Sequence, residues 1–253
     1  MKLAVILPGA VSSGAEEEIR ALVSADTEVV VLGAANGLLA VAGDIDLKGP
    51  EAAMLAMQAE ADGCDAIVLD GMCDFGLPIV RGAVSIPVVG AASATYNLVY
   101  QLARSFGVVS INGEMNPMFL RAIRECGCEE RMTSIRSLER SLKITAEGAE
   151  IPYSPEDWEV ELIKAARPQV EQEDAQCIVI ACASIFGLLP EGAKERMQKE
   201  LGVILVDPQA IAIKTAEMLA SLKLSHSKIE YPTIDPASFD HFIKAESDLR
   251  KSA

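Results

Sequence analysis

The chain has 253 residues, of which 50% are hydrophobic and 23% charged, and its net charge of −15 gives a pI near 4.6. A chain of this length and composition can bury a sizeable core, as one large α/β domain or two small ones, which excludes a disordered protein. The acidic balance disfavours nucleic acid and anionic membranes, because both need a basic surface, and it favours a small-molecule partner.

The two halves of the chain share one pattern, in which strands and helices alternate. Short apolar or β-branched runs predict strands, in chain order, at 2–7, 28–32, 65–69, 86–90, 106–110, 132–136, 178–180 and 203–206. Runs rich in helix formers predict helices from about 15 and at 51–61, 76–83, 91–105, 118–126, 155–171, 191–201 and 207–222. Such alternation indicates an α/β fold with parallel sheets.

Two connections carry further expectations. The loop at 8–14 contains serines that can cap the helix beginning near Ala15. The long connection at 36–50 leaves a sheet beside the presumed ligand edge, and we interpret it as a lid or as half of a dimer contact. A homo-oligomer is therefore expected.

The first apolar run is followed by Pro8 and Gly9, which makes it too short for a signal peptide. No apolar run approaches the roughly 20 residues that a membrane-spanning helix needs. We therefore expect a cytoplasmic protein without a membrane partner, in which all the cysteines are reduced thiols. The six cysteines are Cys64, Cys73, Cys126, Cys128, Cys177 and Cys182.

An internal repeat relates the two halves. A shift of 111 positions aligns Ile178, Val179 and Ile180 with Ile67, Val68 and Leu69, and it aligns the sequence Phe-Gly-Leu at 186–188 with the same sequence at 75–77. The register pairs Cys182 with Gly71 and Ser184 with Cys73. The first copy thus carries its thiol two residues further along the loop.

The repeat predicts two pseudo-symmetric lobes, each with a four-stranded parallel sheet flanked by helices and with the active site in the cleft between them. We assign 1–104 plus 207–253, with the C-terminal helix, to the first lobe and 105–206 to the second. The loops that contain Gly71 and Cys182 would then face each other across the cleft.

Cys182 follows a buried strand and precedes a segment interpreted as a helix, where N–H groups and the helix dipole would lower the pKa of its thiol. It is therefore a candidate base or nucleophile, although a cysteine in this place can also be a small buried hydrophobe. The companion thiol of Cys73 favours the functional interpretation. Cys64 and Cys177 lie near strand starts, at the other edge, and are interpreted as packing residues.

No cofactor is required by any motif in the chain. The spacing of Cys126 and Cys128 resembles half of a metal site, but no second pair of ligands accompanies it, and the histidines, His226 and His241, lie near the C-terminus. Phosphate-binding glycine motifs do not follow any predicted strand. We therefore expect neither a metal nor a nucleotide.

The order of several short motifs carries a resemblance over about residues 2 to 222. In chain order, they are Asp-Gly-Met-Cys-Asp-Phe-Gly-Leu, Ile-Pro-Val-Val-Gly, Phe-Gly-Val-Val-Ser, Ala-Cys-Ala-Ser and Val-Asp-Pro. With the duplicated strand-loop-helix units, they resemble the aspartate/glutamate/hydantoin racemase superfamily, nearest the hydantoin racemase branch.

The resemblance implies a cofactor-independent enzyme with one cysteine from each lobe on opposite faces of an acidic carbon. One thiolate removes the proton and the other thiol returns one from the far side. The catalytic pair expected here is Cys182 and Cys73. The residues expected to bind substrate are Pro8, Gly71, Met72, Asp74, Ser110, Asn112, Ala183 and Ser184.

The chain departs from the family pattern at Gly71, which stands where the family has its first cysteine. A single cysteine at the second position resembles the arylmalonate decarboxylase branch, whose hydroxyl-rich first loop is absent here. The leading hypothesis is a racemase or epimerase for a small compound with an acidic carbon, such as a hydantoin or an amino-acid derivative. The alternatives are a decarboxylase that uses Cys182 alone, or a binding protein that has lost catalysis.

Overall fold

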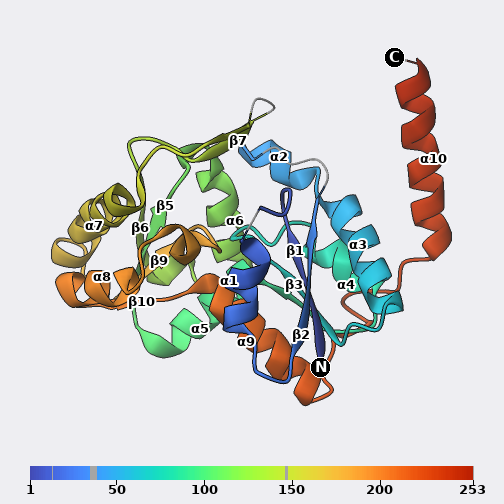
Figure 1. Ribbon diagram of the computed structural model, residues 1–253, viewed down its shortest axis with the longest axis horizontal. Helices are drawn as coiled ribbons and strands as arrows, with labels where there is room; N and C mark the ends of the chain where they lie inside the picture. Colours follow the sequence, from blue (N-terminus) through green and yellow to red (C-terminus); the bar gives the residue numbers. More distant parts are fainter. Residues whose placement is uncertain (13, 35–38, 146–147, 253) are drawn as a thin grey trace.

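The computed structural model describes residues 1–12, 14–34, 39–145 and 148–252, and Figure 1 shows two lobes side by side, each built around a sheet. Both sheets are four-stranded and wholly parallel, which confirms the predicted α/β class. The first contains β1 (Lys2–Leu7), β2 (Glu28–Gly33), β3 (Ala66–Leu69) and β4 (Val88–Gly90). The second contains β5 (Phe106–Ser110), β6 (Met132–Ser137), β9 (Cys177–Ile180) and β10 (Ile204–Leu205).

The strand order is the same in the two sheets. The first sheet has the order β2-β1-β3-β4, and the second has the order β6-β5-β9-β10. The third strand of each lobe, β3 or β9, therefore pairs with the first strand of that lobe and lies inside the sheet. This shared topology agrees with the internal repeat, which aligns β3 with β9.

Helices surround the sheets, and their order follows the predicted one with two additions. They are α1 (Ala15–Leu22), α2 (Ala42–Asp46), α3 (Gly49–Ala61), α4 (Leu77–Ala83), α5 (Ala91–Leu102), α6 (Asn116–Glu125), α7 (Pro155–Glu171), α8 (Ala193–Leu201), α9 (Pro208–Ser221) and α10 (Pro236–Ser252). Short 3-10 turns occur at η1 (Gly113–Met115), η2 (Glu129–Arg131) and η3 (Ile185–Leu188). The additions are α2 and α10.

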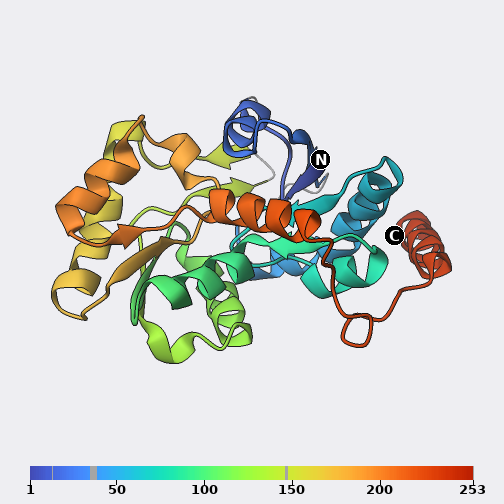
Figure 2. The same ribbon diagram turned by 90° about the horizontal axis from the view of Figure 1, so that it is seen from below.

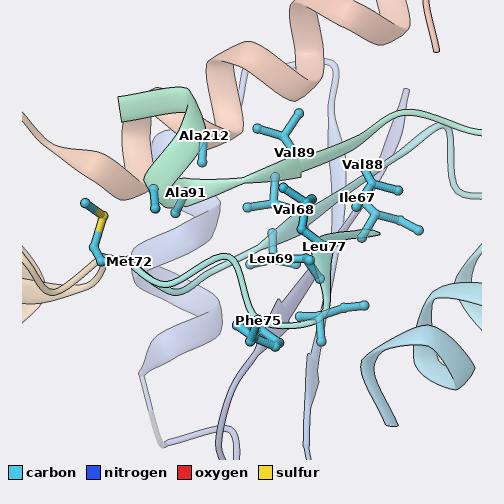
Figure 3. Packing of buried hydrophobic residues seen from close by; sticks show 14 of the residues in the cluster. Ile67, Val68, Leu69, Met72, Phe75, Leu77, Val88, Val89, Ala91 and Ala212 are labelled. Atoms are coloured by element: carbon cyan, nitrogen blue, oxygen red, sulfur yellow. The ribbon is translucent and has the colours of Figure 1, made fainter. Parts of the chain in front are cut away.

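Every residue of β3 and of β9 is buried, as expected for central strands whose two faces are both covered. Figure 3 shows the packed side chains of Ile67, Val68 and Leu69 beside those of β4. Because these strands carry only apolar side chains and one buried thiol, polar side chains enter only where the strands end.

The prediction that a serine side chain caps α1 is wrong for the residues that the structure describes. The N-cap position is Gly14, whose φ of 101° is one that glycine adopts readily, and no side chain caps the helix. Ser13 lies outside the described residues.

Residues 36–38 of the connection predicted at 36–50 also lie outside the described part, and the remainder contains α2. Leu39 forms an isolated antiparallel bridge with Ile144 of the second lobe. Ile144 belongs to a hairpin, β7 (Lys143–Thr145) with β8 (Gly148–Glu150), that was not predicted. The connection after β2 therefore meets the corresponding connection of the other lobe.

After β10 the chain crosses to the first lobe, where α9 packs against β3, β4 and α5, as Figure 2 shows. The helix α10 projects from the edge of the molecule on the side where α3 and α4 lie (Figure 1), and its Phe239 is buried. The assignment of 207–253 to the first lobe stays a prediction. None of the described helices combines the length and the apolar character needed to span a membrane.

One carboxylate attaches α9 to the loop between α1 and β2. Glu217 accepts hydrogen bonds from the backbone N–H and the hydroxyl of Ser24 at 2.7 and 2.8 Å, from the Thr27 hydroxyl at 2.8 Å and from Lys214 at 2.9 Å. Burial raises the pKa of Glu217, but these donors outweigh burial and hold the pKa at about 2.

We predict that Glu217→Gln lowers the free energy of unfolding by about 1–3 kcal/mol at neutral pH, because the donors of Ser24, Thr27 and Lys214 lose a charged acceptor. The wild-type pKa is depressed, so this stabilisation is present above the ordinary value of 4.5 and is lost as pH falls towards about 2. Urea denaturation at neutral and acidic pH measures both effects. Equal stabilities for Glu217→Gln and the exposed control Glu130→Gln would contradict the assignment.

Candidate functional site

Two loops follow the equivalent strands β3 and β9, and they turn in the same way. The N–H of Asp70 donates to Ile6, and that of Ala181, its equivalent, donates to Val109. Each chain then turns sharply, since the N–H of Gly71 donates to the carbonyl of Leu69 at 3.0 Å and that of Cys182 to the carbonyl of Ile180 at 2.8 Å. The register that pairs Gly71 with Cys182 is therefore visible in the backbone.

The thiol of Cys182 is half-buried just beyond β9. Burial is the main cause that raises its pKa, to about 12, and the charge of Asp70 raises it further, while hydrogen bonds from the side chain and backbone of Ser184 oppose the shift. The expected lowering of this pKa is wrong. The segment after Cys182 is the short turn η3 rather than an α-helix, and α8 begins only at Ala193.

The thiol of Cys73 lies close to the space that a cysteine at position 71 would use. Its Sγ is 3.6 Å from the point where a Cβ on Gly71 would stand, and the ring of Phe75 borders the same point at 3.0 Å. Burial raises the pKa of Cys73 to about 12, with a further contribution from Asp74, while the Phe75 amide and Arg121 act in the opposite direction. The displaced thiol therefore returns towards the position of the missing one.

Asp74 caps a helix in the structure. Its two carboxylate oxygens accept hydrogen bonds from the N–H groups of Ala92 and Ser93 at 2.9 Å, at the start of α5. A Cβ on Gly90 would overlap this carboxylate at 2.2 Å, so only glycine leaves room for it. These contacts account for the carboxylate of Asp74 without a substrate.

Ser110 and Asn112 form a second structural group. The buried Ser110 hydroxyl donates to the carbonyl of Asn112 at 2.8 Å, and the Asn112 side chain donates to the carbonyl of Ala40 at 3.0 Å and accepts from the N–H of Glu114 at 3.1 Å. Asn112 thus joins the second lobe to the connection after β2. Their predicted role in substrate binding is untested.

The other predicted residues divide by exposure. Figure 3 shows the chain leaving Leu69 towards Met72, away from the side chains of β3 and β4. The side chains of Met72 and Ala183 are buried, whereas Pro8 and Ser184 are half-buried at the same edges of their sheets.

Sequence reasoning missed Asp70, whose charge acts on Cys182, and Gln209, which binds Asp70. Asp70 is only 4% exposed, and its Oδ2 accepts a hydrogen bond of 2.7 Å from the side chain of Gln209 at the start of α9. Burial raises the pKa of Asp70 to about 6, and the nearby charge of Asp207 adds to this effect, which Gln209 partly offsets. The sequence did contain a signal for Asp70, because this acidic residue directly follows an apolar strand and begins the motif Asp-Gly-Met-Cys.

The remaining cysteines lie in packing positions. Cys64 and Cys177 are buried near the starts of β3 and β9, and the buried Cys128 contacts the carbonyls of Tyr96 and Cys126. Among the described residues, no group of three His, Cys, Asp or Glu side chains is arranged to hold a metal. Two surface hollows, along α7 and beside the β7–β8 hairpin, contain no thiol.

The structure thus contains two parallel sheets of the same strand order, with a thiol beyond the third strand of each lobe. Residues 10–216 match the family described as Asp/Glu/Hydantoin racemase. The chain belongs to this family and is an enzyme of the isomerase class.

Individual relatives agree with this assignment. A hydantoin racemase of Pseudomonas sp. (strain NS671) is 27% identical over 235 residues, which cover 91% of this chain and 90% of the relative. The allantoin racemase structure from Klebsiella pneumoniae has a TM-score of 0.78 at 21% identity and covers 92% of this chain and 94% of its own. A doubly substituted arylmalonate decarboxylase has a TM-score of 0.64 at 18% identity, with 87% and 92% covered. Because both structures are less than 25% identical to this chain, their similarity supports the fold alone.

We predict that alkylation of Cys182 and Cys73 by iodoacetamide continues to accelerate about tenfold per pH unit up to about pH 10.5, whereas an unperturbed thiol levels off near its pKa of about 8.5. A raised pKa leaves both thiols protonated at neutral pH, and only the thiolate reacts. Mass spectrometry of the labelled peptides measures each rate, with N-acetylcysteine as the unperturbed control. A plateau for Cys182 at the same pH as for the control would contradict the effect assigned to burial and Asp70.

Proposed function

We propose that the protein is a cofactor-independent racemase or epimerase for a small compound with an acidic carbon, such as a 5-substituted hydantoin or an amino-acid derivative. Cys182 and Cys73 would be its two proton-transfer groups. The family and the hydantoin racemase relatives support this reaction class. The observation that carries the two-thiol form is the Cys73 Sγ, 3.6 Å from the Cβ position of residue 71 and thus beside the place equivalent to Cys182.

The reaction needs only these two sulfurs and a polarised carbonyl. One thiolate takes the proton from the acidic carbon and becomes a thiol, and the electron pair stays on the substrate as an enolate. The other thiol then gives its proton to the opposite face and becomes a thiolate. The product is the mirror-image centre, and the two sulfurs have exchanged their protonation states.

Backbone N–H groups would stabilise the enolate oxygen. Hydrogen bonds within the turns occupy the amides of Gly71, Asp74 and Cys182. In the described part of the chain, the amides of Met72 and Ala183 donate to no backbone carbonyl, and the repeat places these two residues at equivalent positions. We therefore assign the oxyanion contacts to Met72 and Ala183.

The raised pKa of each thiol has two consequences for this chemistry. Each thiolate, once formed, is a stronger base than an exposed cysteine, which suits a weakly acidic carbon. The protonated form dominates at neutral pH, so a proton donor is ready on either face and the scarce thiolate limits the rate.

One observation favours a second candidate, a decarboxylase with a single thiol. Gly71 lies opposite Cys182 in the repeat, and the similar arylmalonate decarboxylase was solved with a cysteine in place of a glycine and a serine in place of a cysteine. In that reaction, Cys182 would protonate the enediolate left after carbon dioxide departs.

Proton NMR in deuterium oxide, with hydantoins, amino acids and malonates, separates the candidates. Solvent exchange at the stereocentre supports the racemase, whereas loss of carbon dioxide from malonates supports the decarboxylase. Thermal stabilisation by a ligand without either reaction would indicate a binding protein that has lost catalysis.

We predict that Cys182→Ser lowers the exchange rate about 100-fold or more, because a serine hydroxyl is a far weaker base at neutral pH. The matched control is Cys177→Ser, which alters a buried thiol at the other end of β9 and should retain activity. Activity of Cys182→Ser within a few-fold of wild type would remove Cys182 from the mechanism.

We predict that Cys73→Ala abolishes racemisation, followed as optical rotation against time, while exchange continues on the face served by Cys182. The control is Cys126→Ala, which should racemise normally. If Cys73→Ala racemises at the wild-type rate, the site is one-sided. In that case the double variant Gly71→Cys/Cys73→Ala should raise racemisation, because it restores a thiol at the position that aligns with Cys182. The Phe75 ring must shift to admit this side chain, since the new Cβ would lie 3.0 Å from the ring.

A further inference from the structure

Asp70 is a buried acid whose hydrogen bonding is incomplete. One carboxylate oxygen, Oδ2, is held by Gln209 at 2.7 Å, while the other, Oδ1, is buried and has no hydrogen-bond partner in the described structure. An unsatisfied charged acceptor is costly to bury, so a site that retains one is suited to a ligand that supplies a donor.

The position of Asp70 connects it to the reacting centre. It is the first residue after β3 and directly precedes Gly71, the position that the repeat aligns with Cys182. Its carboxylate acts electrostatically on the Cys182 thiol of the other lobe. Gln209, from α9, fixes its orientation.

The charge around this pair is negative. The titratable groups that face Asp70 are Cys182, beyond β9, and Asp207, the N-cap of α9. Lys194 of α8 acts on Asp207, and among the described residues no lysine or arginine acts on Asp70 or Cys182. A substrate carboxylate placed here would meet like charge without a neutralising cation.

We propose that Asp70 is a specificity-determining residue, which selects uncharged substrates that carry an N–H group beside the acidic carbon and rejects substrates that carry a carboxylate there. The free oxygen of Asp70 accepts the hydrogen bond from that N–H, as in a cyclic ureide. This assignment rests on the proposed function for the location of the site, and it deepens that function by naming the chemical class of its substrate.

A matched pair of ligands isolates the charge. A 5-benzylhydantoin and its ring-opened form, N-carbamoylphenylalanine, share the side chain and the N–H donor, but only the open form carries a carboxylate. Isothermal titration calorimetry gives the Kd of each ligand without requiring turnover.

We expect wild type to bind the hydantoin at least tenfold more tightly than the open acid. Asp70→Asn should weaken hydantoin binding about tenfold, because a charge-assisted hydrogen bond is lost, and strengthen binding of the acid. The control is Asp62→Asn, since exposed Asp62 also accepts a hydrogen bond from a glutamine, at 2.9 Å. An unchanged preference in Asp70→Asn, or a wild-type preference for the acid, would overturn the proposal.

The unmodified protein provides a second measurement that does not depend on the folding of a variant. The raised pKa of Asp70, about 6, means that the carboxylate is charged above this value and neutral below it. The preference for the hydantoin should therefore shrink as pH falls from about 7.5 to about 5, while the α-carboxylate of the acid stays ionised. The pKa of Asp207 is also raised, so this carboxylate can contribute to the pH dependence. The same pH series in Asp70→Asn measures the contribution of Asp207 alone.

The two proposals can fail separately. Hydantoin binding with the expected preference, but without solvent exchange, would overturn the proposed racemase and support the assignment of Asp70. Exchange with an unchanged preference in Asp70→Asn would support the racemase and overturn the role of Asp70.

Discussion

Parallel strand pairing is the constraint on which the rest of this structure depends. Because all strands of a sheet run in one direction, the loops that follow them leave from the same edge. β3 and β9 are buried along their whole length, so the polar groups of this region enter only after each strand ends. Asp70 and Cys182 occupy those places, and the crossing of α9 brings Gln209 to the same point.

Much of the fold could be predicted, because strands buried on both faces leave a local signature of apolar β-branched runs, and the 111-residue repeat exposed the duplication. The failures have local causes. The three-residue strands β7 and β8 are too short for a periodic pattern, and η3 begins with apolar residues that also suit an α-helix. Within the site, sequence spacing paired Gly71 with Cys182. It could not show that Cys73 folds back towards Gly71, since that depends on the turn and on Phe75.

The electrostatic character of the site was the least predictable part. A cysteine after a strand suggested a lowered pKa, but the observed shift depends on burial and on Asp70, a residue more than a hundred positions away. Both thiols have raised pKa values for the same principal reason, which is exclusion from water. The nearby charges that act on the two thiols include the carboxylates of Asp70 and Asp74, and Asp207 acts on Asp70 in turn. This balance distinguishes the site from one built to hold an anion.

The two thiols are not related by the internal repeat, since Cys73 aligns with Ser184 rather than with Cys182. In a racemase, thermodynamics limits what this offset can do to the reaction. Mirror-image molecules have equal free energy in water, so their equilibrium ratio is one. The unequal geometry of the two faces can therefore make the enantiomers differ in kcat and in KM separately, but the two values of kcat/KM must coincide. A duplicated protein can lose its internal symmetry without biasing the final composition of its product.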